Sequence, residues 1–153
     1  MKIDSMASLK ADAAQGYQLV TFVVDGQSFG ISALKVRDVL RRQPLTKVPL
    51  APADIAGAIN LRGHIVTAID VRSRLGAKPR EHDEPTMCVV VEGADEWFCL
   101  IVDAVGDVIT IADAAVEPSP ASLPDDWAKM IRGVHRMPDH LLLLLDIDQL
   151  LSL

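Results

Sequence analysis

Arg62 is the residue in this sequence whose type and position best suit a chemical role. It stands between two runs that predict strands, Ala56–Leu61 and the β-branched run after Gly63. Gly63 suits a tight reversal, because glycine adopts a positive φ without strain. The neighbours of Arg62 on one face, Asn60 and Ala58, are small, so its guanidinium can present a fork of N–H donors to a carboxylate. A solvated turn arginine is the plain alternative, which the spacing alone leaves open.

A second candidate surface lies on the predicted strand Val36–Arg41. The alternation of this run puts Val36, Asp38 and Leu40 on one face of a half-exposed strand, which we expect at the edge of a sheet. If this face adjoins the turn, Asp38 pairs with Arg62 and the two residues frame an apolar groove. A surface ion pair stabilises a fold by only about 0–1 kcal/mol, so the value of this one would lie in holding Arg62 for a partner. An ordinary charged rim on a strand edge is the alternative.

The other chemistry-bearing residues predict neither catalysis nor metal binding. No two histidines have the i, i+4 spacing of a helical metal site, and none lies beside Cys or Glu in a ligand pattern. No nucleophile elbow accompanies the residues that could form a triad, and no phosphate-binding glycine motif occurs. We therefore predict no catalytic residue, no metal and no cofactor. The histidines are His64, His82, His135 and His140, and the triad candidates are Ser119, Ser122, His135 and Asp139.

Two cysteines and two tryptophans complete the inventory of special side chains. Cys88 and Cys99 flank a predicted hairpin whose turn lies near Gly93–Ala94, and a two-residue loop would place them directly opposite each other. In a reducing compartment we expect two free, buried thiols rather than a disulfide. Trp97 and Trp127 are expected to fill the core or the contact between lobes, because no basic groove accompanies them.

Charge and length narrow the class of protein. The net charge of −6 offers no basic surface for nucleic acid and no electrostatic attraction to anionic lipid. The longest apolar runs, such as Leu141–Leu145, are far shorter than the ~20 residues of a membrane span. Residues Met1–Gly16 are polar and Ala-rich without an apolar core, so we expect a loose tail rather than a signal peptide, and a cytosolic protein.

The order of the predicted elements favours an all-β fold with a few short helices. No stretch keeps a helical period beyond two or three turns, whereas nine or ten short runs have strand character and turn signals between them. Two independent halves of this chain would each bury only about 60% of their surface, so we expect lobes that depend on each other. Leu141–Leu145 lacks polar alternation, so both of its faces should be covered.

The expected strands are Tyr17–Val24, Gln27–Ile31, Val36–Arg41, Ala56–Leu61, the run through Val71, Met87–Glu92, Trp97–Val102, Asp107–Ile111, Ile131–His135 and Leu141–Ile147. Short helical turns are expected after Ser32, after Asp70 or Ser73, near Asp125–Lys129, and after Asp146 or Asp148. Gln43–Pro52 contains three prolines and is expected to be a connector, and Ala77–Pro85 a charged surface loop.

Four stretches, in this order, resemble CheW-type domains, the scaffold proteins of bacterial chemotaxis. They are GQSFGISALKVRDVL at Gly26–Leu40, NLRGHIVTAIDVRSRL at Asn60–Leu75, CLIVDAVGDVITI at Cys99–Ile111 and IRGVHRMPDHLLLLLDIDQLL at Ile131–Leu151. The resemblance implies a tail at residues 1–16 and a CheW-like domain at residues 17–153. It also implies two small five-stranded SH3-like or OB-like β-barrel lobes, packed together and interleaved along the chain.

The resemblance further implies a non-catalytic cytoplasmic adaptor that couples chemoreceptor tips to the histidine kinase CheA. One lobe would dock on the regulatory domain of CheA, barrel end to barrel end, and the groove between the lobes would receive the receptor tip. The protein would be monomeric alone and recruited to membrane-associated receptor arrays, without inserting in the membrane. The implied partner-binding residues are Val36, Asp38, Gly57, Asn60, Arg62 and Gly63, to which the face of the edge strand adds Leu40.

Two positions depart from the family pattern. The family commonly has Glu where this chain has Asp38, which shortens the reach to Arg62 by one methylene. Ala104 stands where Gly is usual, and the preceding Asp103 is expected to order a turn rather than to contact a partner. The competing classes are a small barrel that binds nucleic acid or a small ligand, against which the acidic balance counts, and an enzyme, for which no constellation of residues exists.

Overall fold

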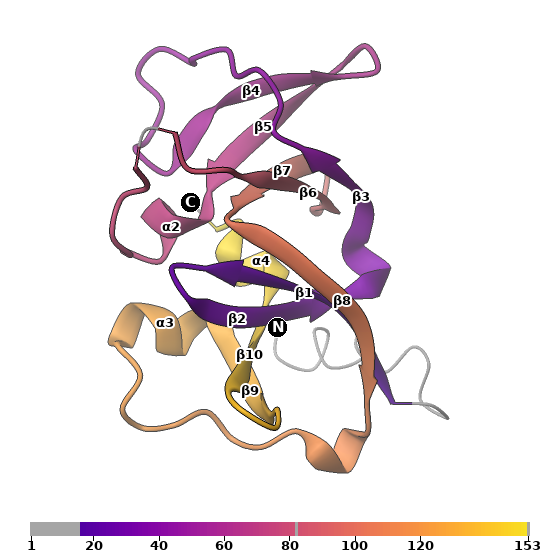
Figure 1. Ribbon diagram of the computed structural model, residues 1–153. Coiled ribbons are helices and arrows are strands. Elements are labelled where there is room, and N and C mark those ends of the chain that lie inside the picture. Colours follow the sequence, from indigo (N-terminus) through magenta and orange to yellow (C-terminus); the bar gives the residue numbers. More distant parts are fainter. Residues whose placement is uncertain (1–15, 82, 153) are drawn as a thin grey trace.

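The computed structural model describes residues 16–81 and 83–152. The chain forms two lobes, each built on a five-stranded sheet (Figure 1). The first lobe contains β1 (Tyr17–Val24), β2 (Gln27–Ser32), β8 (Ala104–Ile111), β9 (Ile131–Arg136) and β10 (Leu141–Leu145), in the spatial order β8-β1-β2-β10-β9. The second lobe contains β3 (Val36–Arg41), β4 (Ile55–Leu61), β5 (His64–Asp70), β6 (Met87–Glu92) and β7 (Trp97–Val102), in the order β3-β6-β7-β5-β4. The predicted fold class is confirmed.

The second lobe is inserted into the first. The chain builds β1 and β2, leaves for the five strands of the second lobe, and returns with β8 to pair with β1. The last strand, β10, then pairs in parallel with β2. The tail predicted at residues 1–16 lies outside the described residues except for Gly16.

Two tight turns of the same kind shape the hairpins. Asp25 and Gly26, between β1 and β2, have φ of 49° and 78°, and Arg62 and Gly63, between β4 and β5, have φ of 53° and 88°. Positive φ at both central residues is the type I′ geometry, whose twist matches that of the flanking strands. The Asp-Gly turn is therefore as the sequence predicts.

Short helices follow strands where an aspartate ends the strand. Asp70 accepts a hydrogen bond from Arg72 N–H and begins α2 (Val71–Arg74), and Asp146 accepts one from Asp148 N–H and begins α4 (Ile147–Leu150). The last strand consequently ends at Leu145, earlier than predicted. The remaining helical elements are η2 (Ala33–Lys35), η3 (Asp113–Ala115) and α3 (Asp125–Met130). None of the helices in the described ranges is long and apolar enough to cross a membrane.

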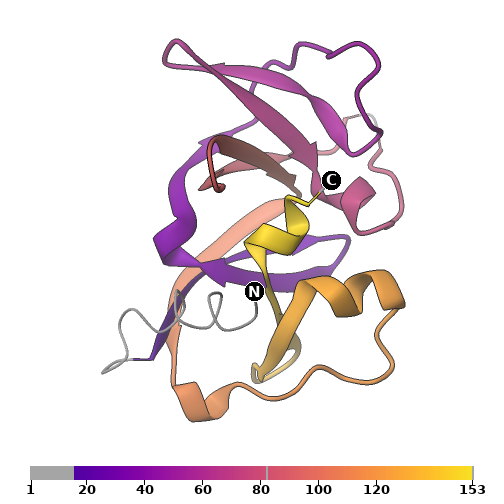
Figure 2. The same ribbon diagram turned by 180° about the vertical axis from the view of Figure 1, so that it is seen from behind.

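One apolar core belongs to both lobes. Phe22 and Phe29 enter it from the first lobe, Val89 and Leu100 from the second, and Leu150 from α4. Figure 2 shows α4, in yellow, lying between the two lobes. Neither lobe covers this core alone, which supports the expected dependence of each lobe on the other.

The interior strand β10 is covered on both faces, as predicted. Leu143 and Leu145 pack into the shared core, whereas Leu142 and Leu144 pack on the other side with Leu19. The parallel pairing with β2 and the antiparallel pairing with β9 satisfy its backbone.

The tryptophans separate into one confirmed and one wrong prediction. Trp127 on α3 donates a hydrogen bond from Nε1 to the carbonyl of Leu75, 2.7 Å away, and packs against Phe29, so it joins the lobes. Trp97 is 43% exposed at the start of β7 and fills no core. It is paired with Glu92 at the end of the β6–β7 ladder, next to the loop that joins the two strands.

Candidate functional site

The predicted pair of Asp38 and Arg62 joins the two edge strands of the second sheet. In the order β3-β6-β7-β5-β4, β3 and β4 are the edges. Arg62 Nη2, just after β4, lies 3.3 Å from Asp38 Oδ2 on β3, so the pair spans the sheet's two ends. Asp38 Oδ1 accepts the N–H of Val39, which fixes the carboxylate. The aspartate therefore reaches the guanidinium although it is one methylene shorter than glutamate, and the predicted pairing is confirmed.

The turn holds Arg62 in a conformation that arginine does not favour. Its φ of 53° is left-handed, which costs an L-residue with a Cβ about 1–2 kcal/mol relative to the right-handed region. Asn60 Oδ1 accepts the N–H of Gly63 at 2.9 Å and locks the reversal. The Arg62 side chain is 80% exposed, so its ion pair stabilises the fold by at most about 1 kcal/mol. The fold thus gains little from arginine at this position, which favours an external role.

The edge strand presents the opposite face from the one expected. Val36 packs against the shared core and Leu40 against a smaller cluster inside the second lobe, so both are half-buried. The outward face carries Arg37, Val39 and Arg41. The prediction that Val36 and Leu40 project as apolar contacts was wrong. The alternation does place them on one face of β3, but that face packs against the core.

Gly57 lies beneath a neighbouring segment rather than on the surface. It is buried, and a Cβ built there would lie 2.6 Å from the carbonyl oxygen of Thr46. Thr46 exchanges two backbone hydrogen bonds with Ala58, at 2.9 and 2.8 Å, and so lays residues 42–54 along β4. Gly57 therefore admits this segment, which we call the strap, and does not itself form an exposed contact.

The strap adds exposed residues that the sequence did not single out. Leu45, Val48 and Leu50 are exposed, and Leu50 is fully exposed with a φ of 61°. Arg42 and Lys47 give the strap positive charge, and no acidic residue precedes Asp54 in it. The sequence signal that could have indicated these exposed residues is the presence of apolar residues between the prolines of the connector. We call Arg62, Asn60, Val39 and the strap together the rim.

A second group of charges lies between the lobes. Asp103 accepts hydrogen bonds from Arg72 Nη2 at 2.6 Å, from Arg80 Nη2 at 2.9 Å and from Asp25 N–H at 2.7 Å. Burial opposes ionisation of Asp103, but its hydrogen bonds with Arg72, Asp25 and Arg80 outweigh burial and hold the pKa of this carboxyl below its usual value. Asp103 orders the β1–β2 turn, as predicted. Its long-range arginine partners were not predicted.

The cysteine register differs from the prediction. The loop between β6 and β7 has four residues, closed by a hydrogen bond from Gly93 N–H to the carbonyl of Glu96 at 2.8 Å. Cys88 is therefore opposite Ile101, and Cys99 is opposite Val90, so the cysteines are diagonal neighbours. Both are buried and free, which confirms the predicted state of the thiols.

The histidine and serine candidates do not assemble. Ser119 Oγ and His135 Nδ1 lie 3.4 and 3.3 Å from the backbone carbonyl oxygens of Ile131 and Ala115 respectively, and His140 pairs with the adjacent Asp139. Residues 16–81 and 83–152 contain no group of three His, Cys, Asp or Glu side chains that could hold a metal ion. His82 lies outside the described residues.

The sequence and fold match known proteins along nearly the whole chain. A family model for the CheW-like domain matches residues 18–153. The probable chemotaxis protein CheW of Rhizobium etli is 30% identical over 135 residues, which cover 88% of this chain and 87% of that protein. The chemotaxis protein CheW of Rhizobium meliloti is 32% identical over 133 residues, covering 87% and 86%. The structure of the scaffolding protein TtCheW from Thermoanaerobacter tengcongensis superposes with a TM-score of 0.79 at 29% identity, covering 89% and 92% of the two chains.

Proposed function

This chain belongs to the CheW-like family, and from that premise we propose that it is a chemotaxis scaffold that couples the cytoplasmic tips of chemoreceptors to the histidine kinase CheA. The proposal rests on the family match along the whole domain and on relatives whose names give chemotaxis and scaffolding as their role. On this proposal the protein acts in the cytoplasm without catalysis, is monomeric alone, and joins receptor arrays through its partners.

The exposed, strained Arg62 is the observation that best supports a partner-binding site on the rim. Within residues 16–81 and 83–152 its guanidinium has one ion-pair partner, Asp38, at 3.3 Å, and most of its surface faces solvent. A partner carboxylate can therefore bind the remaining N–H donors without breaking the turn. Val39, which follows Asp38 on β3, supplies exposed apolar area near this charge. The combination of a central arginine and apolar neighbours is typical of a protein-binding surface.

The two proposed partners are expected to use different parts of the molecule. We place one partner on the rim, at the end of the second lobe, and the other between the lobes. Separate titrations with a receptor-tip peptide and with the regulatory domain of CheA, followed by amide chemical shifts, assign each. We expect one titration to shift the amides of Asn60, Arg62 and Gly63 and the other to leave them in place.

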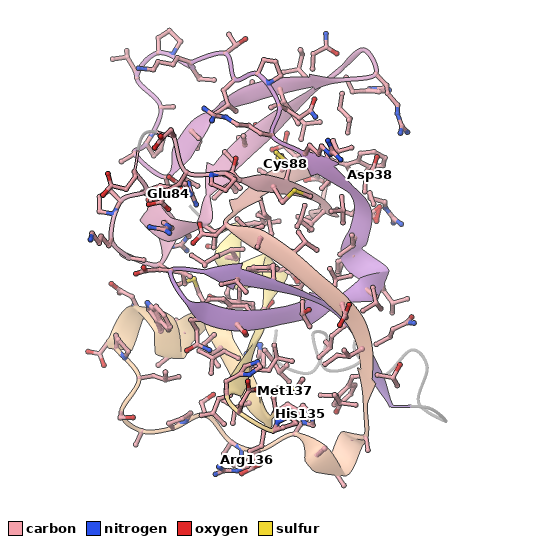
Figure 3. All side chains as sticks on the ribbon, viewed as in Figure 1. Asp38, Glu84, Cys88, His135, Arg136 and Met137 are labelled. Atoms are coloured by element: carbon pink, nitrogen blue, oxygen red, sulfur yellow. The ribbon has the colours of Figure 1, made fainter. Side chains whose placement is uncertain are left out.

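Replacing Arg62 by alanine tests the site directly. We expect at least a tenfold loss of affinity for the rim partner, which corresponds to about 1.4 kcal/mol, with the folded state retained. Arg136→Ala is the matched control, because Arg136 forms an exposed ion pair with Glu117 at 2.9 Å at the far end of the first lobe (Figure 3). Unchanged binding of both partners by Arg62→Ala would remove the rim from the proposal. Failure of the wild-type chain to bind either partner would contradict the proposed function itself.

A further inference from the structure

Cys88 and Cys99 form a contacting pair of thiols in the middle of the second sheet. Their side chains hydrogen-bond to each other, and both residues are almost entirely buried. Cys88 is the accessible member, because it lines a cavity of about 240 Å³ between the base of the strap, at Arg42 and Gln43, and the charged segment that contributes Arg80 and Glu84. A small oxidant can therefore reach one thiol while the second stands behind it.

The two thiols differ in their readiness to ionise. The hydrogen bond from Cys99 lowers the pKa of Cys88 to about 7, with burial opposing and a backbone hydrogen bond from Gln43 assisting. The hydrogen bond to Cys88 and burial raise the pKa of Cys99. Since the thiolate is the reacting form, Cys88 reacts first and Cys99 stays protonated until it is needed.

The two cysteines also lie on the strands between the strand that carries Asp38 and the strand that follows Arg62. Cys88 on β6 is opposite Leu40 on β3, the strand that carries Asp38. Cys99 on β7 is opposite Ala68 on β5, the strand that follows Arg62. Any change in the spacing of β6 and β7 is therefore passed to the two strands that hold the ion pair.

We propose that Cys88 and Cys99 are a reversible thiol–disulfide pair, oxidised by hydrogen peroxide, that alters the rim. The part of this inference that concerns partner binding rests on the proposed function, whereas the chemistry of the two thiols does not. Packing of two inert thiols in an aliphatic core is the alternative that the test must exclude.

The chemistry balances with peroxide as the only co-reactant. The Cys88 thiolate attacks one peroxide oxygen, the O–O bond breaks, and the leaving hydroxide takes a proton to become water. The Cys99 sulfur then attacks the sulfur of the Cys88 sulfenic acid, and its proton leaves with the displaced hydroxide as a second water. Two thiols are oxidised by two electrons in total, and one peroxide is reduced. A small dithiol reverses the step by thiol–disulfide exchange.

The diagonal placement makes this disulfide a strained one. Diagonal neighbours in an antiparallel pair lie about 7–8 Å apart between Cα atoms, whereas disulfides usually span about 4.4–6.8 Å. Closing the bond therefore draws β6 and β7 together locally. Strain of this kind makes a disulfide easy to reduce, which is typical of regulatory rather than structural bonds.

Mass spectrometry of the full-length chain tests the chemistry without any partner. After peroxide treatment of the folded protein, we expect the loss of two hydrogen atoms and a peptide that links Cys88 to Cys99, both reversed by dithiothreitol. Because the pKa of Cys88 is lowered, the rate of oxidation should level off at a lower pH than that of an unperturbed thiol, whose pKa lies near 8.5. Oxidation only after unfolding in urea would overturn the proposal.

Alanine variants then separate the roles of the two sulfurs. Cys99→Ala should stop at the Cys88 sulfenic acid, which a dimedone probe traps, and Cys88→Ala should consume peroxide at least tenfold more slowly. If either variant fails to fold, the linked peptide of the wild-type chain still decides. Equal reactivity of the two variants would contradict the assigned order.

Amide chemical shifts and binding measurements test whether oxidation of the cysteine pair alters the rim. Oxidation of the wild-type chain should shift the amides of Leu40 and Arg62 and weaken the rim partner at least fivefold, and dithiothreitol should restore both. If the disulfide forms but neither changes, the link to the rim is wrong. If the wild-type chain binds neither partner while the linked peptide and the amide shifts are found, the proposed function fails and the thiol pair stands.

Discussion

Two sites in this molecule pair arginine with aspartate, but one is buried between the lobes and the other is exposed on the rim. At the contact between lobes, Asp103 is only 17% exposed and binds both Arg72 and Arg80. On the rim, Arg62 is mostly exposed and binds Asp38 alone among the described residues. Burial removes water from the first site, so removal of Asp103 would leave the two arginines with only their longer contacts to Glu84 and Asp70. Water remains at the second, so the guanidinium stays available to another protein.

The backbone around each site shows the same contrast. Asp103 N–H bonds the carbonyl of Val23 at 3.0 Å, and its carboxylate holds the Asp25 turn, so the first site is tied to the fold through main chain as well. Arg62 occupies a left-handed position that asparagine or glycine would fill with less strain. A fold selected for stability alone would not place arginine there.

Asp103→Ala should give the largest effect on stability. We expect the free energy of unfolding to fall by about 3 kcal/mol, because Arg72 and Arg80 would lose the carboxylate that binds them both and keep only their longer contacts with Glu84 and Asp70. Urea denaturation measures this. Asp38→Ala is the matched variant and should cost no more than about 1 kcal/mol. Equal losses in the two variants would end the distinction between the sites.

Gly57→Val should destabilise the chain by about 1–3 kcal/mol. The new side chain would collide with the Thr46 carbonyl, 2.6 Å from the Cβ position, and would strain a φ of 153°. Gly63→Ala is the control, because its Cβ meets open space and only its φ of 88° is unfavourable. Thermal unfolding should rank Gly57→Val as the more damaging change. The reverse order would mean that the strap does not depend on Gly57.

Acid should weaken the buried site in a defined window. The pKa of Asp103 is lowered in the folded state, so its stabilising contribution is present above its unfolded pKa, near 3.9. That contribution is lost as the pH falls through the lower, folded pKa. Asp103→Asn should therefore flatten the fall in stability below about pH 4, as measured by urea midpoints across pH. An unchanged slope would show that other carboxyls cause the fall.

Arg62→Asn should have the smallest effect on stability and still reduce binding. Asparagine tolerates left-handed φ, so relief of strain should offset the lost ion pair to within about 0.5 kcal/mol. Affinity for the rim partner should nevertheless fall about as much as in Arg62→Ala, as measured by calorimetric titration. Wild-type affinity in the asparagine variant would show that turn shape, not the guanidinium, is what the partner recognises.

The local sequence pattern predicted those structural features that are formed by residues close together in the sequence. The Asp25 turn, the alternation of β3 and the small residues before Arg62 were all visible, and the last two led to the ion pair with Asp38. The direction of β3 was not visible, because periodicity groups Val36 with Leu40 but does not say which side the core lies on. The cysteine register was wrong because it depends on loop length, and one local turn signal does not fix that.

Features that join distant segments were beyond sequence reasoning. Asp103 meets Asp25 from 78 residues away and Arg72 from 31. The need for glycine at position 57 arises only when Thr46 comes to lie over it. Leu50 looked like an ordinary connector residue, and only its fully exposed side chain and its φ of 61° mark it as part of the rim.

The insertion of one lobe within the other has a consequence for synthesis on the ribosome. All five strands of the inserted sheet have emerged once Val102 is outside the exit tunnel, whereas β2 must wait for β10, more than a hundred residues later. Until then the β1–β2 hairpin has an open edge, which another nascent chain can pair with. The final leucine-rich strand therefore closes the molecule, and chains that stop before Leu141 should aggregate.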